Sequence, residues 1–285
     1  MIRARAFLKD LRLEHTLFAL PFAYVGAIMA ARGLPSWTAL AWITLAVFGA
    51  RTAAMAANRY FDRDIDARNP RTARRALASG ALDPSTMLWA AAIGLALLLV
   101  AAWELNPLCV KLMPLAALGV LLYPLCKRFT WLVHFVLGAV DGLAPLGAFI
   151  GIAGKTSGEA WLLFVAVTVW VAGFDIIYAL MDVDIDRREG LRSLPARFGE
   201  RSGRLLPLAL HVVMIAALFV AGYATHAAWP YDVGIAAACV LVVYEERLFG
   251  WAKNVFALNE RVFAANMTFS VVFLATTAAS FTLGY

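Results

Sequence analysis

Acidic residues spaced four apart stand out in a chain that is otherwise apolar. The segment NRYFDRDID places Asn58, Asp62 and Asp66 in an N-x-x-x-D-x-x-x-D pattern. Residues four apart lie on one face of a helix, so these three side chains would stack over two turns. Asp64 points elsewhere on the same helix and is a weaker candidate.

A second acidic stretch reads DIIYALMDVDID and ends another apolar segment. Offsets of 3, 4, 7 and 11 bring its residues Asp175, Tyr178, Asp182 and Asp186 onto one stripe of the sixth helix. Asp184 falls outside that stripe. Both acidic clusters are expected at the same membrane face, at the ends of the second and sixth helices.

Carboxylates gathered in this way indicate a bound cation. Like charges one turn apart repel each other, so an empty cluster is destabilising. Mg²⁺ removes that penalty, because it binds a few carboxylate oxygens and completes its shell with water and substrate phosphate. One cluster alone could equally be a solvated helix end. Two clusters with basic residues close behind them favour a diphosphate held through Mg²⁺.

Other polar residues suit the same site. YPLCK places Tyr123 and Lys127 one turn apart at the end of the fourth helix. Arg51 lies seven residues before Asn58, on its face, where an unpaired arginine inside a membrane is costly. Asp141 either lines the cavity or forms a structural pair.

The remaining candidates are each open to a simpler interpretation. Arg12, Arg71 and Arg197 could contact the ligand, or lipid headgroups, or only fix the topology. Asn266 is either an interhelical hydrogen-bonding residue or a pocket residue. The histidines share no ligand spacing, and the three cysteines lack any metal-ligand or disulfide pattern; these residues are His15, His134, His211, His226, Cys109, Cys126 and Cys239.

The elements that must position these residues are membrane helices. Hydrophobic residues make up 62% of the 285 and charged residues 15%, which excludes an ordinary soluble domain. We expect a single all-helical domain, 1–285, in which about nine helices surround a central cavity. The spans expected in the lipid bilayer are Leu17–Ala31, Trp37–Ala57, Met87–Trp103, Leu108–Leu125, Leu132–Ile152, Trp161–Met181, Leu205–Tyr223, Gly234–Tyr244 onward and Ala264–Leu283. The eighth is interrupted by Glu245, Glu246 and Arg247.

Basic residues predict the orientation. Lysines and arginines concentrate at the N-terminus and in the two polar loops at 58–84 and 182–204. The positive-inside rule puts these segments, and therefore the acidic clusters, in the cytoplasm. The net charge of +6 is explained by this topology and by anionic lipid, and it does not indicate nucleic acid.

The ordered motifs resemble the UbiA superfamily of intramembrane prenyltransferases. NRYFDRDID, YPLCK and DVDID carry the likeness, and EHTLFALPFAY, DARNPRTARR and RSLPARFG strengthen it. It extends from Arg12 to Asn266 and is similar to the branch of 4-hydroxybenzoate polyprenyltransferases and their menaquinone-pathway relatives. One departure is Arg75-Ala-Leu-Ala, where many relatives have a proline, which concerns only the shape of this loop.

The resemblance implies a set of roles. The first metal–diphosphate motif would be Asn58, Asp62 and Asp66, and the second Asp182 and Asp186. Tyr123 and Lys127 would lie near the diphosphate and the forming cation, and Asp175 matches a frequent acidic position. A cap of cytoplasmic loops would cover the site, in a bacterial cytoplasmic membrane.

The chemistry expected is Mg²⁺-dependent transfer of a polyprenyl group from its diphosphate to an aromatic carboxylic acid, 4-hydroxybenzoate or a dihydroxynaphthoate. Fixed positive charge would stabilise the leaving diphosphate, and a dry cavity would protect the allylic cation. No residue is identified as the base. An ion-coupled transporter would carry its carboxylates near the membrane centre. A phosphatidyltransferase would need a DGxxAR-type pattern, and a structural membrane scaffold would not need two carboxylate clusters.

Overall fold

The computed structural model describes residues 16–283, and all regular elements in that range are helices. The long ones are α2 (Thr16–Ala31), α3 (Trp37–Arg68), α4 (Pro84–Leu105), α5 (Pro107–Cys126), α6 (Val133–Ala153), α7 (Gly158–Ala179), α10 (Ser202–Ala224), α11 (Pro230–Trp251) and α12 (Val255–Leu283). The short ones are η2 (Leu180–Asp182), α8 (Val183–Arg188) and α9 (Leu194–Phe198).

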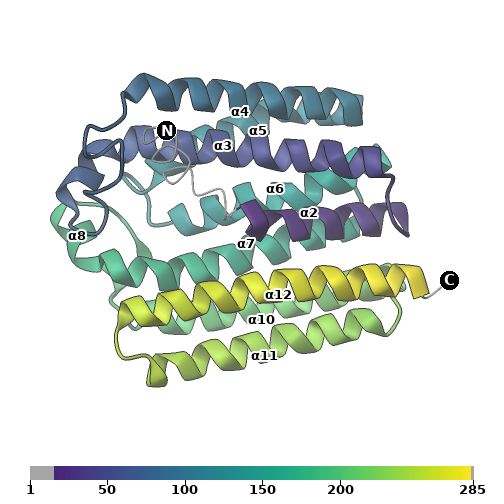
Figure 1. Cartoon of the computed structure of the whole chain (residues 1–285). Coiled ribbons are helices and arrows are strands. Elements are labelled where there is room, and N and C mark those ends of the chain that lie inside the picture. Colours follow the sequence, from purple (N-terminus) through teal and green to yellow (C-terminus); the bar gives the residue numbers. More distant parts are fainter. Residues whose placement is uncertain (1–15, 284–285) are drawn as a thin grey trace.

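The long helices run side by side along one axis (Figure 1). Helices α3, α4 and α5 pack together on one side, and α10, α11 and α12 on the other. Helices α2, α6 and α7 lie between these two groups. The α3–α4 connection and α8 lie at the same end of the bundle, on the left in Figure 1. This end is called the carboxylate end below, because both acidic motifs are there.

The expected multi-pass membrane fold is confirmed. Within residues 16–283, seven helical stretches are long and apolar enough to cross a membrane. Helix α2 is apolar but shorter, and α11 is not among the seven. The number of nine spans therefore stays a prediction.

The first acidic motif lies on a continuous helix, as predicted. Helix α3 continues through the motif and ends at Arg68, so the polar loop begins at Asn69 rather than at 58. The second motif is different, because α7 ends at Ala179 and a 3₁₀ turn precedes α8. The helical backbone nevertheless continues to Arg188, and all four residues of the predicted stripe line one pocket.

Glycines allow α3 and α4 to approach closely. A Cβ atom on Gly49 would lie 2.6 Å from the Gly94 carbonyl oxygen, and a Cβ on Gly94 would lie 2.6 Å from the Gly49 oxygen. No real side chain tolerates such contacts, so both positions require glycine. Small residues of this kind bring membrane helices into backbone contact, and here they fix α3, which carries the first motif.

A buried polar ring joins four helices in the other half of the bundle. Trp170 Nε1 donates to Asn266 Oδ1 at 2.6 Å, and Asn266 Nδ2 donates to Glu245 Oε1 at 2.6 Å. Glu245 Oε2 lies 2.7 Å from His211 Nδ1, and His211 Nε2 lies 3.2 Å from the Trp170 carbonyl oxygen. Asn266 therefore has the interhelical role. Glu245 does not interrupt the eighth helix, because partners on two other helices, His211 on α10 and Asn266 on α12, satisfy its charge.

Candidate active site

A polar chamber of about 300 Å³ lies at the carboxylate end, between α3, α5, α6, α7 and α8. The structure brings eleven predicted residues to its wall: Arg51, Asn58, Asp62, Asp66, Arg71, Tyr123, Lys127, Asp175, Tyr178, Asp182 and Asp186. Arg12 falls outside the described residues. Two acidic motifs more than 100 residues apart in sequence thus face one space.

The first motif presents one face of α3 to the chamber. Asn58 Nδ2 donates to Asp62 Oδ2 at 3.2 Å, and Lys127 Nζ donates to the same oxygen at 2.5 Å. Asp62 is only 3% exposed. The Asp64 side chain is 71% exposed, as its position on the helix predicts.

Arg75 is a partner that the sequence analysis missed. Its Nη1 donates to both carboxylate oxygens of Asp66, at 2.8 and 2.6 Å. Arg75 follows a loop of turns after α3, and nothing in its spacing relates it to the motif. Arg75 lies in the DARNPRTARR segment, which resembles the family's loop but does not indicate that Arg75 binds Asp66.

The second motif is held by the same loop. Arg71 donates through Nε to Asp182 Oδ1 at 3.0 Å and through Nη2 to Oδ2 at 2.5 Å. Asn69 adds a bond to Oδ1 at 3.1 Å. Burial lowers the pKa of Arg71, but the hydrogen bonds and charge of Asp182 outweigh burial and raise that pKa above its usual value. The Arg71 guanidinium also lies 5.7 Å from the centre of the Tyr178 ring.

The donor chemistry of the chamber fits a hard divalent cation. Asp62 Oδ1 is buried without a hydrogen-bond partner, and Arg128 Nη2 is 3.9 Å from it. Asp186 forms no ion pair with a described lysine or arginine. In residues 16–283 no three acidic, histidine or cysteine side chains converge as a ready-made metal cluster. The aspartates are available as oxygen ligands if their basic partners shift toward a phosphate.

Arg51 and Asp141 mark the deep end of the chamber. Arg51 Nη1 donates to Asp141 Oδ1 at 3.2 Å, and their side chains are 16% and 10% exposed. Asp141 therefore both lines the cavity and forms a pair. The same two residues also line a second cavity, so the pair stands where the two spaces meet.

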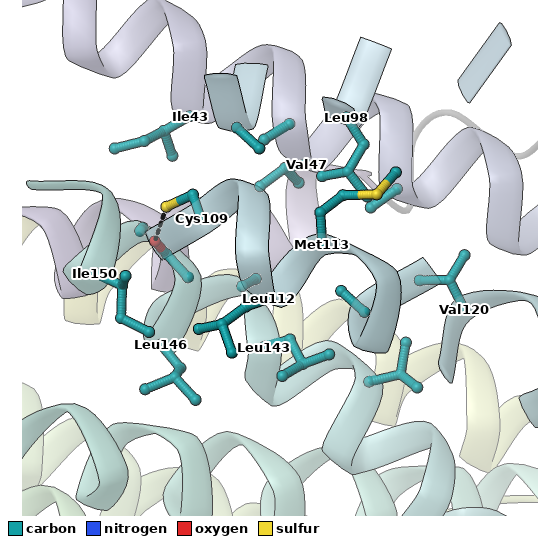
Figure 2. A pocket seen from close by; sticks show the side chains of 18 of the residues that line it. Ile43, Val47, Leu98, Cys109, Leu112, Met113, Val120, Leu143, Leu146 and Ile150 are labelled. Carbon is teal, nitrogen blue, oxygen red and sulfur yellow. Dashed lines mark hydrogen bonds between the residues drawn. The ribbon is translucent and has the colours of Figure 1, made fainter. Parts of the chain in front are cut away.

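This second cavity is apolar and holds about 550 Å³. Figure 2 shows aliphatic side chains around it, among them Val47, Leu98, Met113 and Leu143. Its wall comes mostly from α3, α4, α5 and α6. An apolar chain attached to a head group in the polar chamber could extend into this space.

A histidine that spacing did not single out also lines the polar chamber. His134 is 3% exposed, and its Nδ1 lies 2.7 Å from Asp175 Oδ2. The two residues lie 41 positions apart, so no sequence pattern could pair them.

The structure does not bring Arg197 into the polar chamber. Arg197 belongs to the short helix α9, and its guanidinium lies 5.4 Å from the centre of the neighbouring Phe198 ring. Its predicted contact with substrate therefore has no support from its position.

Comparison with known proteins gives consistent results. Residues 19–281 match the UbiA prenyltransferase family. The chain is 34% identical over 229 residues to a 4-hydroxybenzoate octaprenyltransferase of Alkalilimnicola ehrlichii, covering 78% of this chain and 76% of the relative. It is 31% identical over 251 residues to the protein of the same name from Aliivibrio fischeri, covering 87% of each.

Solved structures share the fold. The apo structure of a UbiA homolog from Aeropyrum pernix superposes with a TM-score of 0.84 at 34% identity, over 93% of this chain and 97% of that one. A UbiA homolog from Archaeoglobus fulgidus bound to GPP and Mg²⁺ superposes with a TM-score of 0.73 at 16% identity, over 96% of this chain and 99% of that one. At that identity the second likeness concerns the fold alone.

Proposed function

The chain belongs to the UbiA prenyltransferase family, and we propose that it transfers a polyprenyl group from an allylic diphosphate to 4-hydroxybenzoate. One observation carries this proposal: the acidic motifs of α3 and of 182–186 face one polar chamber that also holds Lys127, Arg71 and Arg75. The names of the relatives in Alkalilimnicola and Aliivibrio support the choice of acceptor.

The diphosphate would bind among the basic side chains at the mouth of the chamber. Lys127, Arg71 and Arg75 each contact an aspartate now, and each can donate to a phosphate oxygen instead. The carboxylates that they leave, with Asp186 and the side-chain oxygen of Asn58, are the proposed Mg²⁺ ligands. When bound, Mg²⁺ would neutralise the diphosphate and favour its departure.

The rest of the chamber suits the formation of the new carbon–carbon bond. The bond between the prenyl carbon and the diphosphate oxygen breaks, and a ring carbon of the acceptor bonds to the prenyl carbon. Tyr123 and Tyr178 line the wall where ring faces can stabilise a cation. The apolar cavity beyond Arg51 offers room for the isoprenoid chain and keeps water away.

The acceptor ring must lose a proton, and Asp175 is suited to take it. Asp62, Asp66, Asp141 and Asp182 are each paired with a lysine or arginine, and Asp186 is already assigned to Mg²⁺. Among the described residues, Asp175 forms an ion contact only with His134. No described lysine or arginine side chain therefore competes with the acceptor ring for its oxygens.

We also propose that the carboxylate end faces the cytoplasm of a bacterial cell, with the chain in its cytoplasmic membrane. The concentration of basic residues in the loops of this end supports that orientation. Cysteine labelling from either side of oriented vesicles tests it.

The experiment is a transfer assay with purified protein in lipid nanodiscs. Geranyl diphosphate and a long-chain polyprenyl diphosphate are supplied in turn, with 4-hydroxybenzoate or a dihydroxynaphthoate, and with Mg²⁺ or EDTA. We expect prenylated 4-hydroxybenzoate and equimolar pyrophosphate only with Mg²⁺. Prenylation of the naphthoate alone would assign the menaquinone-type reaction. Uptake of an ion without prenyl transfer to either acceptor would refute the enzyme and indicate a transporter.

A further inference from the structure

His134 links two parts of the active site that the sequence keeps far apart. On one side its Nδ1 lies 2.7 Å from Asp175 Oδ2, on α7. On the other side the backbone N–H of Leu194 donates to His134 Nε2 at 3.2 Å. Leu194 is the first residue of α9. The 189–193 segment connects α9 to α8, which contains Asp186.

The two contacts fix the tautomer of the imidazole. A backbone N–H can only donate, so His134 Nε2 must be the unprotonated nitrogen. In the neutral ring Nδ1 then carries the hydrogen and donates it to Asp175. His134 thus accepts a hydrogen bond from the Leu194 backbone and donates one to the Asp175 carboxylate. Its 3% exposure leaves water little access to replace either bond.

The segment that ends at Leu194 is tied to the phosphate side of the chamber. The Arg192 backbone N–H donates to the Lys127 carbonyl oxygen at 2.7 Å, and the Arg192 side chain donates to the Phe129 carbonyl oxygen at 2.7 Å. Lys127 itself binds Asp62. The 189–194 segment is therefore held against the backbone of Lys127, the lysine that the proposed function assigns to the diphosphate.

We propose that His134 is a positioning residue. It holds the Asp175 carboxylate at the chamber wall and fixes its position relative to the 189–194 segment. The inference rests on the proposed function, in which Asp175 serves the acceptor. His134 has no direct contact with substrate in this role. Its loss should therefore affect the acceptor side of the reaction and leave donor binding intact.

Two substitutions separate this role from simple packing. In His134→Gln, the amide group can donate to Asp175 through nitrogen and accept from Leu194 through oxygen. In His134→Leu, a similar volume is filled but both bonds are lost. We expect His134→Leu to lower kcat/KM for the acceptor by roughly 10- to 100-fold, the range for lost outer-sphere partners in metal sites. His134→Gln should recover most of that loss.

The measurements are the steady-state constants for each substrate, in nanodiscs, for wild type, both variants and each variant combined with Asp175→Asn. The KM for the prenyl diphosphate should change less than twofold. In the Asp175→Asn background, His134→Leu should have no further effect on kcat/KM for the acceptor, because His134 affects the acceptor through that carboxylate. The thermal midpoint of each variant reports on folding.

The results distinguish failure of the inference from failure of the proposed function. The inference is overturned if glutamine and leucine give equal activity while wild type prenylates 4-hydroxybenzoate. It is also overturned if His134→Leu costs as much with Asp175→Asn as without it. If wild type transfers no prenyl group, the proposed function fails first. In that case the glutamine and leucine variants still test whether His134 bonds to Asp175 and Leu194. If these bonds exist, only the leucine variant should lower the thermal midpoint.

Discussion

Replacing Asp62 with alanine is the sharpest test of the two-motif site. Asp62 is 3% exposed, one oxygen lies 2.5 Å from Lys127 Nζ, and the other has no hydrogen-bond partner. Asp64 is a matched control on the same helix. Its side chain is 71% exposed and forms a salt bridge with Arg63 at 3.7 Å.

The structure sets the expected size of each effect. Removing one partner of a fully buried ion pair costs about 3–5 kcal/mol. The Lys127 side chain is 25% exposed, so solvent recovers part of that cost and about 2 kcal/mol of stability should be lost. Loss of a preorganised electrostatic group lowers kcat by about 10²–10³-fold. Asp64→Ala should change stability by no more than about 0.5 kcal/mol, since it breaks an exposed pair.

The assay is prenyl transfer in nanodiscs across a Mg²⁺ titration, with thermal unfolding measured on the same samples. We expect Asp62→Ala to lose transfer at every Mg²⁺ concentration and to unfold a few degrees lower, while Asp64→Ala matches wild type. The reasoning would be refuted if Asp62→Ala retained transfer within tenfold of wild type, or if both variants lost it equally.

Three further predictions follow from the same geometry. Asp182→Ala should abolish transfer and Asp184→Ala should not, because only Asp182 lines the chamber; parallel rate measurements compare the two. Asp141→Ala should lower the thermal midpoint by the equivalent of about 3 kcal/mol, because Arg51 would stay buried without its carboxylate. Replacing both residues of that pair with leucine should recover most of this stability in a thermal scan. Met113→Trp should raise the KM for a long-chain donor and spare geranyl diphosphate, because it fills the apolar cavity.

The first acidic motif could be predicted because its geometry is local. A spacing of four on a continuous helix places Asn58, Asp62 and Asp66 on one face, and α3 does continue to Arg68. The second motif includes a 3₁₀ turn at Leu180–Asp182, yet Asp175, Tyr178, Asp182 and Asp186 all line the same chamber. The convergence of both motifs on one chamber did not depend on that detail, since each lies at the same end of the bundle.

The partners of the carboxylates could not be predicted from spacing. Asn69 and Asp182 lie 113 positions apart, and His134 and Asp175 lie 41 apart. Such pairs depend on how α6, α7 and the loop after α3 are packed, and hydrophobic periodicity carries no information on that. Arg197 is the reverse case, because its charge suggested a ligand contact, yet it does not line the polar chamber.

The buried polar ring has a consequence for how the protein is made. Helix α11 carries Glu245 in its interior, and an ionisable residue at the centre of a single inserting helix costs about 2.5–3.5 kcal/mol. Its partner His211 precedes it on α10, but Asn266 follows it on α12, which is synthesised later. We therefore expect α11, whose membrane span is still a prediction, to settle in lipid more readily once α12 has emerged and supplied Asn266. The C-terminal third should enter the membrane as one cooperative unit, and ribosomes stalled before α12 should leave α11 accessible to water.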